Sequence, residues 1–147
     1  MTTISTILSI IAILVSIYNV YSQNELSKNI NRKNLDALYF NRIYCKALIY
    51  KIPKARRKLH IDQDGGLVND GELRAVLNDI RNDSIYYSYI DKKFYDKLVA
   101  KLQDLEDYIV RAGNSKILGE TQCDFHNEIQ IKISNIYNCI NDHYKRY

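Results

Sequence analysis

The feature that most constrains this chain of 147 residues is an uncharged, apolar stretch from Ile4 to Tyr21. Every Lys, Arg, Asp and Glu of the sequence follows this stretch. About 18 helical residues, at a rise of about 1.5 Å each, span roughly 27 Å, which is close to the thickness of the hydrocarbon core of a bilayer. We therefore predict one N-terminal transmembrane helix, within residues 1–22.

Two other interpretations of this stretch are a secretory signal peptide and a buried core helix. A secretory signal peptide begins with basic residues and ends in a small-residue cleavage site, whereas this chain begins Met1-Thr2-Thr3 and its apolar run ends at Tyr18–Tyr21. A buried core helix stays open, because the run is only just long enough to span a bilayer. Aromatic residues at the end of the run favour the span, because Tyr is enriched at membrane interfaces.

The distribution of charge predicts the orientation of the span. No basic residue precedes it, whereas Lys28, Arg32 and Lys33 follow it. Basic residues favour the cytoplasmic side, so we expect a single-pass protein of the cell membrane with its N-terminus outside and its C-terminal domain in the cytoplasm. Three cysteines with no CxxC spacing agree with reduced thiols in that compartment.

One side of the predicted span carries small and polar residues. They recur at alternating steps of three and four: Thr2, Ser5, Ser9, Ala12, Ser16, Asn19 and Gln23. Helices associate in lipid through close packing of small residues and interhelical hydrogen bonds. We therefore expect homo-oligomerisation through a stripe at Ser5, Ser9, Ala12, Ser16 and Asn19. Two alternatives remain: the stripe lines a pore, or its hydroxyl groups bond back to their own helix.

The rest of the chain is predicted to be all-α. Its length suffices for one domain, and one Pro with five Gly argues against a turn-rich β fold. We expect the span to continue into a cytoplasmic bundle of about four helices. The predicted divisions are residues 1–22 for the span, 23–52 for a stalk and the first bundle helix, and 53–147 for the remainder of the bundle.

Apolar residues at helical spacing predict the faces of these helices. In the first helix, which we expect to end or kink at Pro53, the face is Leu26, Ile30, Leu35, Leu38, Tyr39, Ile43, Ala47 and Tyr50. In the second, capped by Asp70 and ended or kinked at residues 82–84, it is Leu73, Val76, Leu77 and Ile80.

Two further helices complete the predicted bundle. Asp91 caps the third and Gly113 closes it, with a face of Phe94, Leu98, Leu102, Leu105 and Ile109. Thr121 and Asp124 resemble a capping box that opens the fourth, with a face of Phe125, Ile129, Ile133, Ile136, Ile140 and Tyr144.

Basic residues are concentrated next to the predicted span. Residues 25–58 contain ten Lys or Arg and two acidic residues. The densest run is Lys54, Arg56, Arg57 and Lys58, which we interpret as a site for an anion or for lipid headgroups. A phosphate-bearing ligand such as a nucleotide, held by Arg and stacked on Tyr, is a second interpretation, and a solvated helix end is the third.

Two groups of residues suggest metal sites by residue type. Asp62, Asp64, Asn69 and Glu72 match part of the calcium-binding loop of an EF-hand, with Gly66 at the turn and Leu67 as the backbone ligand, but one ligand position is deleted. An ordinary helix–helix turn has the same composition. Cys123 with His126 and Cys139 with His143 suggest zinc, but the two cysteines are 16 residues apart, or roughly 24 Å along one helix, so the spacing argues against a shared ion.

No catalytic motif is present. The sequence contains no GxSxG, HExxH, GxxxxGK[ST] or GxGxxG, so we expect neither an enzyme nor a cofactor. The function that we expect is interaction or signalling at the cytoplasmic membrane face, with lipid, a second copy of the chain or another protein as partner. The alternative is a ligand-gated, membrane-permeabilising effector, which small bacterial defence proteins resemble in architecture only. A soluble helical protein with a buried first helix is the third interpretation.

Overall fold

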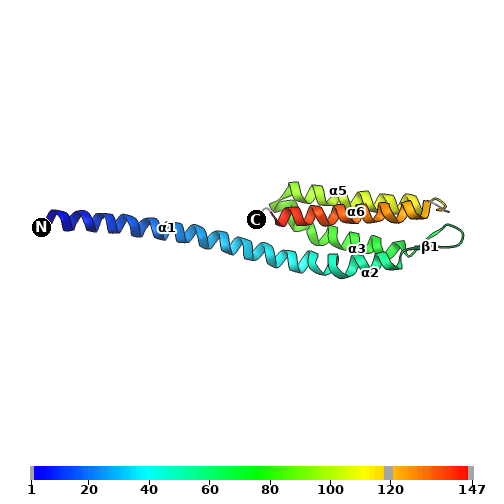
Figure 1. The fold of residues 1–147 in the computed structure, drawn as a ribbon, viewed down its shortest axis with the longest axis horizontal. Helices are drawn as coiled ribbons and strands as arrows, with labels where there is room; N and C mark the ends of the chain where they lie inside the picture. Colours follow the sequence, from blue (N-terminus) through cyan, green and yellow to red (C-terminus); the bar gives the residue numbers. More distant parts are fainter. Residues whose placement is uncertain (1, 118–120, 146–147) are drawn as a thin grey trace. The chain divides into compact units, whose positions relative to one another are not determined.

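The computed structural model describes the backbone of residues 2–117 and 121–145, and side chains from Ile11 onward. The described chain is mostly helical and divides into two compact units, Met1–Leu38 and Tyr39–Tyr147. Helix α1 runs from Thr2 to Phe40, so it is continuous across the boundary between the units (Figure 1). The prediction of a mainly helical chain with a helical bundle is confirmed.

The first unit consists of helix α1 alone. No Pro or Gly interrupts it, and every side chain from Ile11 to Tyr21 is exposed. Among the described residues, no helix combines the length and the apolar character needed to cross a membrane. The side chains of residues 4–10, which form the first part of the predicted span, lie outside the described part.

Two π-helical segments follow α1 and lead into helix α2. They are η1 (Asn41–Cys45) and η2 (Ala47–Lys51), and α2 covers Ile52–Lys58 with Pro53 in its first turn. The sequence predicts an end or a kink at Pro53, and the helix does not end there. Proline lacks an N–H group and its ring crowds the carbonyl four residues earlier. A wide turn precedes it, in which the N–H of Ile52 bonds to the carbonyl of Ala47, and the chain continues as helix.

The buried face of this segment differs from the predicted one. The predicted residues Leu26, Ile30, Leu35, Leu38 and Tyr50 are exposed. Ala47 of the predicted face is buried, and Tyr39 and Ile43 are partly buried. The buried residues of this segment are Tyr44, Ala47, Leu48, Ile52, Ala55 and Leu59. Steps of four between Tyr44, Leu48 and Ile52 suit the wider π-helical turn, which a search at a period of 3.6 residues does not follow.

A short β-hairpin follows α2. Strands β1 (His60–Ile61) and β2 (Leu67–Val68) pair antiparallel, with His60 opposite Val68. At the turn, Asp62 Oδ1 accepts the N–H groups of Asp64 (3.0 Å) and Gly66 (2.6 Å). The predicted loop from residue 62 to 71 is present at residues 62–66, but the sequence does not predict the two strands beside it, because strands of two residues carry no readable alternation.

Helix α3 covers Asp70–Asp83 and begins one residue earlier than its predicted cap implied. Asn69 occupies the N-cap position with φ 64°, a left-handed conformation that Asn adopts more readily than most residues, so Asp70 lies in the first turn. The predicted break at residues 82–84 is confirmed. The short helices η3 (Ser84–Tyr86) and α4 (Tyr87–Ile90) follow.

Helices α5 (Lys92–Gly113) and α6 (Thr121–Tyr144) complete the bundle. The Asp91 side chain accepts the N–H of Phe94 at 3.0 Å, which confirms it as the cap of α5, and α5 ends at Gly113 as predicted. The residues before Thr121 lie outside the described part. The apolar faces predicted for α3, α5 and α6 are in the core, with only Val76 and Tyr144 partly exposed. Helix α5 packs against α3 and α6, and α3 packs against α2 (Figure 1).

Candidate anion-binding face

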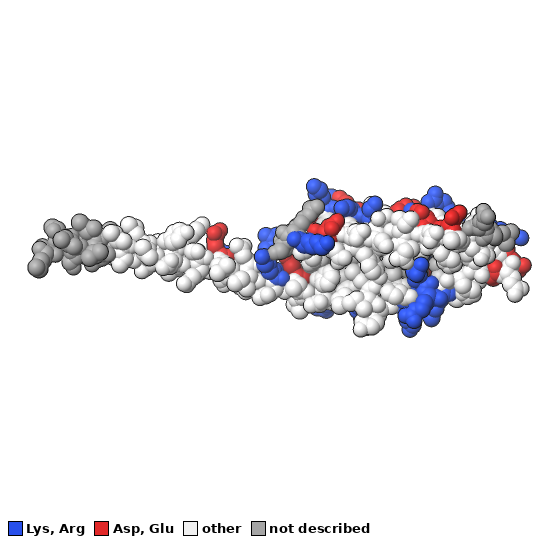
Figure 2. Space-filling view, in the orientation of Figure 1, with Lys and Arg blue, Asp and Glu red and all other residues white. Residues whose placement is uncertain are grey.

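The outer side of the segment from η1 to α2 is exposed along its whole length. Its exposed residues recur at helical spacing, opposite the buried side that Tyr44, Leu48 and Ile52 occupy. We call this surface the basic face and define it by Arg42, Lys46, Ile49, Tyr50, Lys54 and Arg57. In the space-filling view, blue side chains gather over α2 (Figure 2).

The basic face lies in a segment without negative charge. No acidic residue occurs between Asp36 and Asp62, an interval that holds seven Lys or Arg. Two of these are neutralised by α3: Lys51 lies 2.8 Å from Asp79, and Lys58 lies 2.6 Å from Glu72. Within the described part of the chain, the other five have neither an ion pair nor a side-chain hydrogen bond: Arg42, Lys46, Lys54, Arg56 and Arg57.

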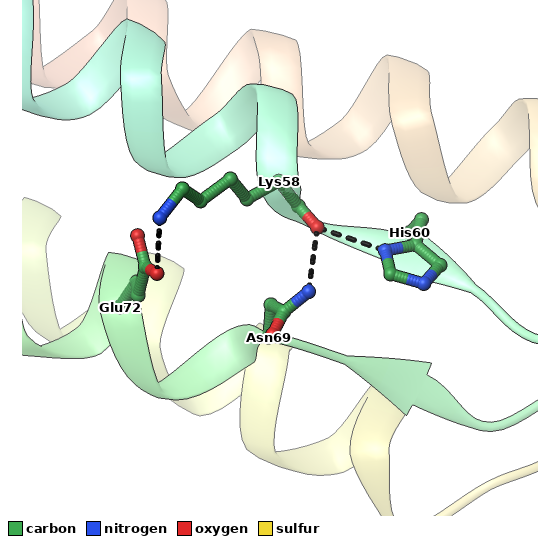
Figure 3. A network of polar contacts seen from close by, with 4 residues as sticks. All are labelled: Lys58, His60, Asn69 and Glu72. Carbon is green, nitrogen blue, oxygen red and sulfur yellow. Dashed lines mark hydrogen bonds and ion pairs between the residues drawn. The ribbon is translucent and has the colours of Figure 1, made fainter.

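Hydrogen bonds fix the end of α2 on the hairpin and α3 (Figure 3). The carbonyl of Lys58 accepts Nδ1–H of His60 at 2.9 Å and the side-chain amide of Asn69 at 3.2 Å. A carbonyl only accepts, so Nδ1 of His60 carries the proton. Together with the Lys58–Glu72 pair, these bonds hold the run of basic residues on a rigid helix end.

Two apolar side chains lie in the middle of the basic face. Ile49 is 58% exposed and Tyr50 is 69% exposed, between Lys46 and Lys54 along the chain. The face therefore offers cations on either side of a branched aliphatic group and an aromatic ring. Arg56 lies at its edge, half-buried, and its Nε is buried without a hydrogen-bond partner among the described residues.

The structure gives the calcium candidates other partners. Asp62 accepts backbone N–H groups of its own turn, Glu72 pairs with Lys58, and Asn69 turns its amide toward the Lys58 carbonyl. The contacts of Asp62 are those of an ordinary hairpin turn, whereas the other two connect α2 with the start of α3. In the described part of the chain, no group of three His, Cys, Asp or Glu side chains is arranged to hold a metal ion.

The residues considered for zinc lie on one helix, as the spacing argument required. Cys123 and His126 are in the first turns of α6, and Cys139 and His143 are in its last turns. His143 is buried, stacks on Phe94 with ring centroids 3.9 Å apart, and lies 3.5 Å from Asp91 through Nδ1. The three cysteines are free: Cys45, Cys123 and Cys139.

A cleft of about 630 Å³ lies between the facing ends of α5 and α6. Its lining includes Arg111, Lys116, Asp124, Glu128 and Lys132. Lys132 is already paired with Asp104 (2.8 Å) and Glu128 (3.3 Å). The cleft therefore carries both signs of charge, whereas the basic face carries only positive charge.

The predicted membrane stripe is described only in part. The side chains of Ser5 and Ser9 lie outside the described part, and Ala12, Ser16 and Asn19 are exposed on α1. The predicted basic run, Lys54 to Lys58, is brought together on α2, but sequence reasoning missed Arg42, Lys46, Ile49 and Tyr50. The available signal was the absence of acidic residues between Asp36 and Asp62.

A scan against protein-family models, a search of curated proteins and a search of solved structures each found no match to this chain. The function is therefore inferred from the residues of this chain.

Proposed function

We propose that the protein is a single-pass membrane protein, anchored by residues Ile4–Tyr21, with its helical bundle on the cytoplasmic side. The observation that carries this proposal is that the apolar side chains of the uncharged stretch are exposed wherever the structure describes them, from Ile11 to Tyr21. Ile11, Ile13, Leu14, Val15 and Ile17 are each at least half exposed. A contiguous apolar surface of this kind is unfavourable in water, and lipid removes the cost.

The bundle has a complete core without this helix. The buried cluster begins at Tyr44, and the earliest residue packed against it is Phe40. Residues Ile11–Tyr21 thus contribute nothing to the core, which argues against the interpretation of this stretch as a core helix. A lipid environment suits a helical stretch of this composition.

We further propose that the chain self-associates along α1 and acts through interaction or signalling at the membrane. The stripe of small and polar residues ends at Gln23, and Leu26 and Ile30 continue it with the same steps of three and four. Both apolar residues are exposed in the single chain. Small residues favour packing between helices in lipid, and apolar residues favour packing between helices in water. One helix–helix interface along α1, which we call the seam, therefore suits both environments.

Cross-linking in membranes tests self-association. The Ser9→Leu/Ser16→Leu variant replaces two stripe residues by bulky ones and should abolish the cross-linked species. The matched control is Ile10→Leu/Ile17→Leu, which changes two residues with the same spacing beside the stripe and should leave cross-linking unchanged. Equal cross-linking of the wild type and both variants would contradict the proposed seam.

Labelling of Cys123 tests the orientation. This thiol is exposed on α6, so a membrane-impermeant maleimide should label it only after intact cells are permeabilised. Labelling in intact cells would place the bundle outside and contradict the proposed topology.

A second proposal is a ligand-gated membrane effector. It is supported by the unpaired cations of the basic face, which suit a phosphate-bearing ligand, and by the polar stripe, which suits a water-filled lumen. Dye-loaded liposomes containing the protein should then leak only when a cell extract is added. Absence of leakage under both conditions would favour the interaction protein over the effector.

A further inference from the structure

The basic face has the chemistry of a surface for a polyanion. Five cations, spread over residues 42–57, have no ion pair or side-chain hydrogen bond among the described residues, and no acidic residue of the segment offsets their positive potential. Arg42, Lys46, Tyr50 and Lys54 follow one another at steps of four, which is close to one turn of the wide helical segments η1 and η2. The cations therefore form a row and not a single cluster.

The shape of the face distinguishes among anions. Arg42 lines a cleft with Asp83 and Tyr86, but the rest of the face is the outer, convex side of a helix and does not enclose a small phosphate compound. A linear anion with regularly repeated charges contacts such a row at several points at once. The exposed ring of Tyr50 and the side chain of Ile49 lie within the row, and they are suited to the flat faces of nucleobases, which an aromatic ring binds by stacking.

Lipid headgroups offer negative charges to the same cations, but no flat ring on which Tyr50 stacks. The exposed aromatic ring within the row therefore favours a nucleic acid over a bilayer surface.

We propose that the basic face binds single-stranded nucleic acid, with Arg42, Lys46, Lys54 and Arg57 on the phosphates and Tyr50 under a base. A single strand is favoured over a duplex, because a duplex keeps its base faces stacked on each other and away from Tyr50. The contacts are to the backbone and to the face of a base, so they carry little preference for sequence.

Fluorescence anisotropy tests this proposal with the full chain in a neutral detergent. The probes are labelled 20-nucleotide oligo(dT) and oligo(U), with a duplex of the same length for comparison. We expect the single strands to bind more tightly than the duplex. The logarithm of the association constant should fall with the logarithm of salt concentration with a slope of about −3, because each phosphate neutralised on a single strand contributes about −0.7.

Two triple variants test whether oligonucleotide binding depends on the basic face or only on the net charge of the protein. Lys46→Gln/Lys54→Gln/Arg57→Gln should weaken binding roughly tenfold to a hundredfold. The control Lys92→Gln/Lys93→Gln/Lys97→Gln removes the same three charges from the exposed side of α5 and should change affinity less than about threefold. Equal losses in both variants would overturn the proposal. Circular dichroism checks that each variant keeps its helical content.

Two further measurements separate nucleic acid from other anions. Tyr50→Ala should weaken binding about fivefold, the lower end of the effect of removing one stacking ring, and unchanged affinity would overturn the assignment to nucleic acid. Phosphatidylglycerol added to the micelles should not displace the oligonucleotide, and displacement would assign the face to lipid headgroups instead. Binding in detergent does not depend on where the chain resides in cells, so failure of the membrane proposal is a separate result.

Discussion

A buried pair of hydroxyl groups joins the first segment of the bundle to the end of α3. Tyr44 and Ser84 are completely buried, and their oxygens lie 2.9 Å apart. Ser84 Oγ donates to the Ile80 carbonyl at 2.6 Å, so the Tyr44 hydroxyl donates to Ser84 Oγ. Burial raises the pKa of Tyr44 far above its usual value, so its phenol stays protonated.

Removal of the Ser84 hydroxyl should lower the free energy of unfolding more than removal of the Tyr44 hydroxyl. Ser84→Ala leaves the Tyr44 hydroxyl buried without an acceptor and should lower the free energy of unfolding by about 2 kcal/mol. Tyr44→Phe leaves Ser84 bonded to Ile80 and should cost about 1 kcal/mol. Urea denaturation measures both. A larger loss for Tyr44→Phe would contradict the assigned direction of the bond.

The thiols should differ in reactivity. Burial raises the pKa of Cys139, which lowers the fraction of reactive thiolate at neutral pH. We expect iodoacetamide at pH 7.5 to alkylate Cys139 about tenfold or more slowly than the exposed Cys123. Mass spectrometry of timed samples measures the two rates, and urea should remove the difference. Equal rates in the folded chain would contradict the burial of Cys139.

At the scale of elements, α5 is the centre of the bundle because it packs against both α3 and α6. Leu102 lies at its middle and is completely buried. Leu102→Ala should lower the free energy of unfolding by about 3 kcal/mol, through lost burial and the cavity that remains. The control Val110→Ala removes methyl groups from a partly exposed position of the same helix and should cost less than about 1 kcal/mol. Urea denaturation of both variants should show the contrast, and equal losses would contradict the packing of α5.

The sequence correctly predicts the helices whose apolar spacing repeats over several turns. Helices α3, α5 and α6 each repeat an apolar residue every three or four positions over several turns, and their faces are predicted correctly. The cap at Asp91 is predicted because its side-chain bond is local. These features need no knowledge of the rest of the fold.

The sequence does not predict elements that are very short or that depend on contacts with residues far away along the chain. The strands of the hairpin are two residues each, and Asn69 adopts its left-handed conformation where its amide meets the Lys58 carbonyl of another element. The wide turns before Pro53 shift the buried face away from the predicted residues. The basic face is predicted only at residues 54–58, because its remaining members are separated along the chain and joined by the helix.

At the scale of the molecule, the core belongs to one unit. Every residue of the buried cluster lies within Tyr39–Tyr147. A fragment of residues 39–147 should therefore fold without α1, as a helical domain with one cooperative transition in urea. Circular dichroism measures this transition, and a fragment with little helix in buffer would contradict the independence of the bundle.

The two units also divide the proposed activities. The first supplies the anchor and the seam, and the second supplies the basic face. If this division holds, changes in the basic face should leave cross-linking intact, and changes in the stripe should leave oligonucleotide binding in detergent intact.

The central claim is that residues Ile4–Tyr21 anchor the chain in a membrane. Its most direct test is extraction of cell membranes with alkaline carbonate. The wild-type chain should remain in the membrane pellet. Ile11→Arg/Leu14→Arg places two charges within the span at a cost of about 3 kcal/mol each, in exposed side chains outside the core, and should move the chain into the supernatant. Release of the wild-type chain by carbonate would contradict the proposed membrane anchor.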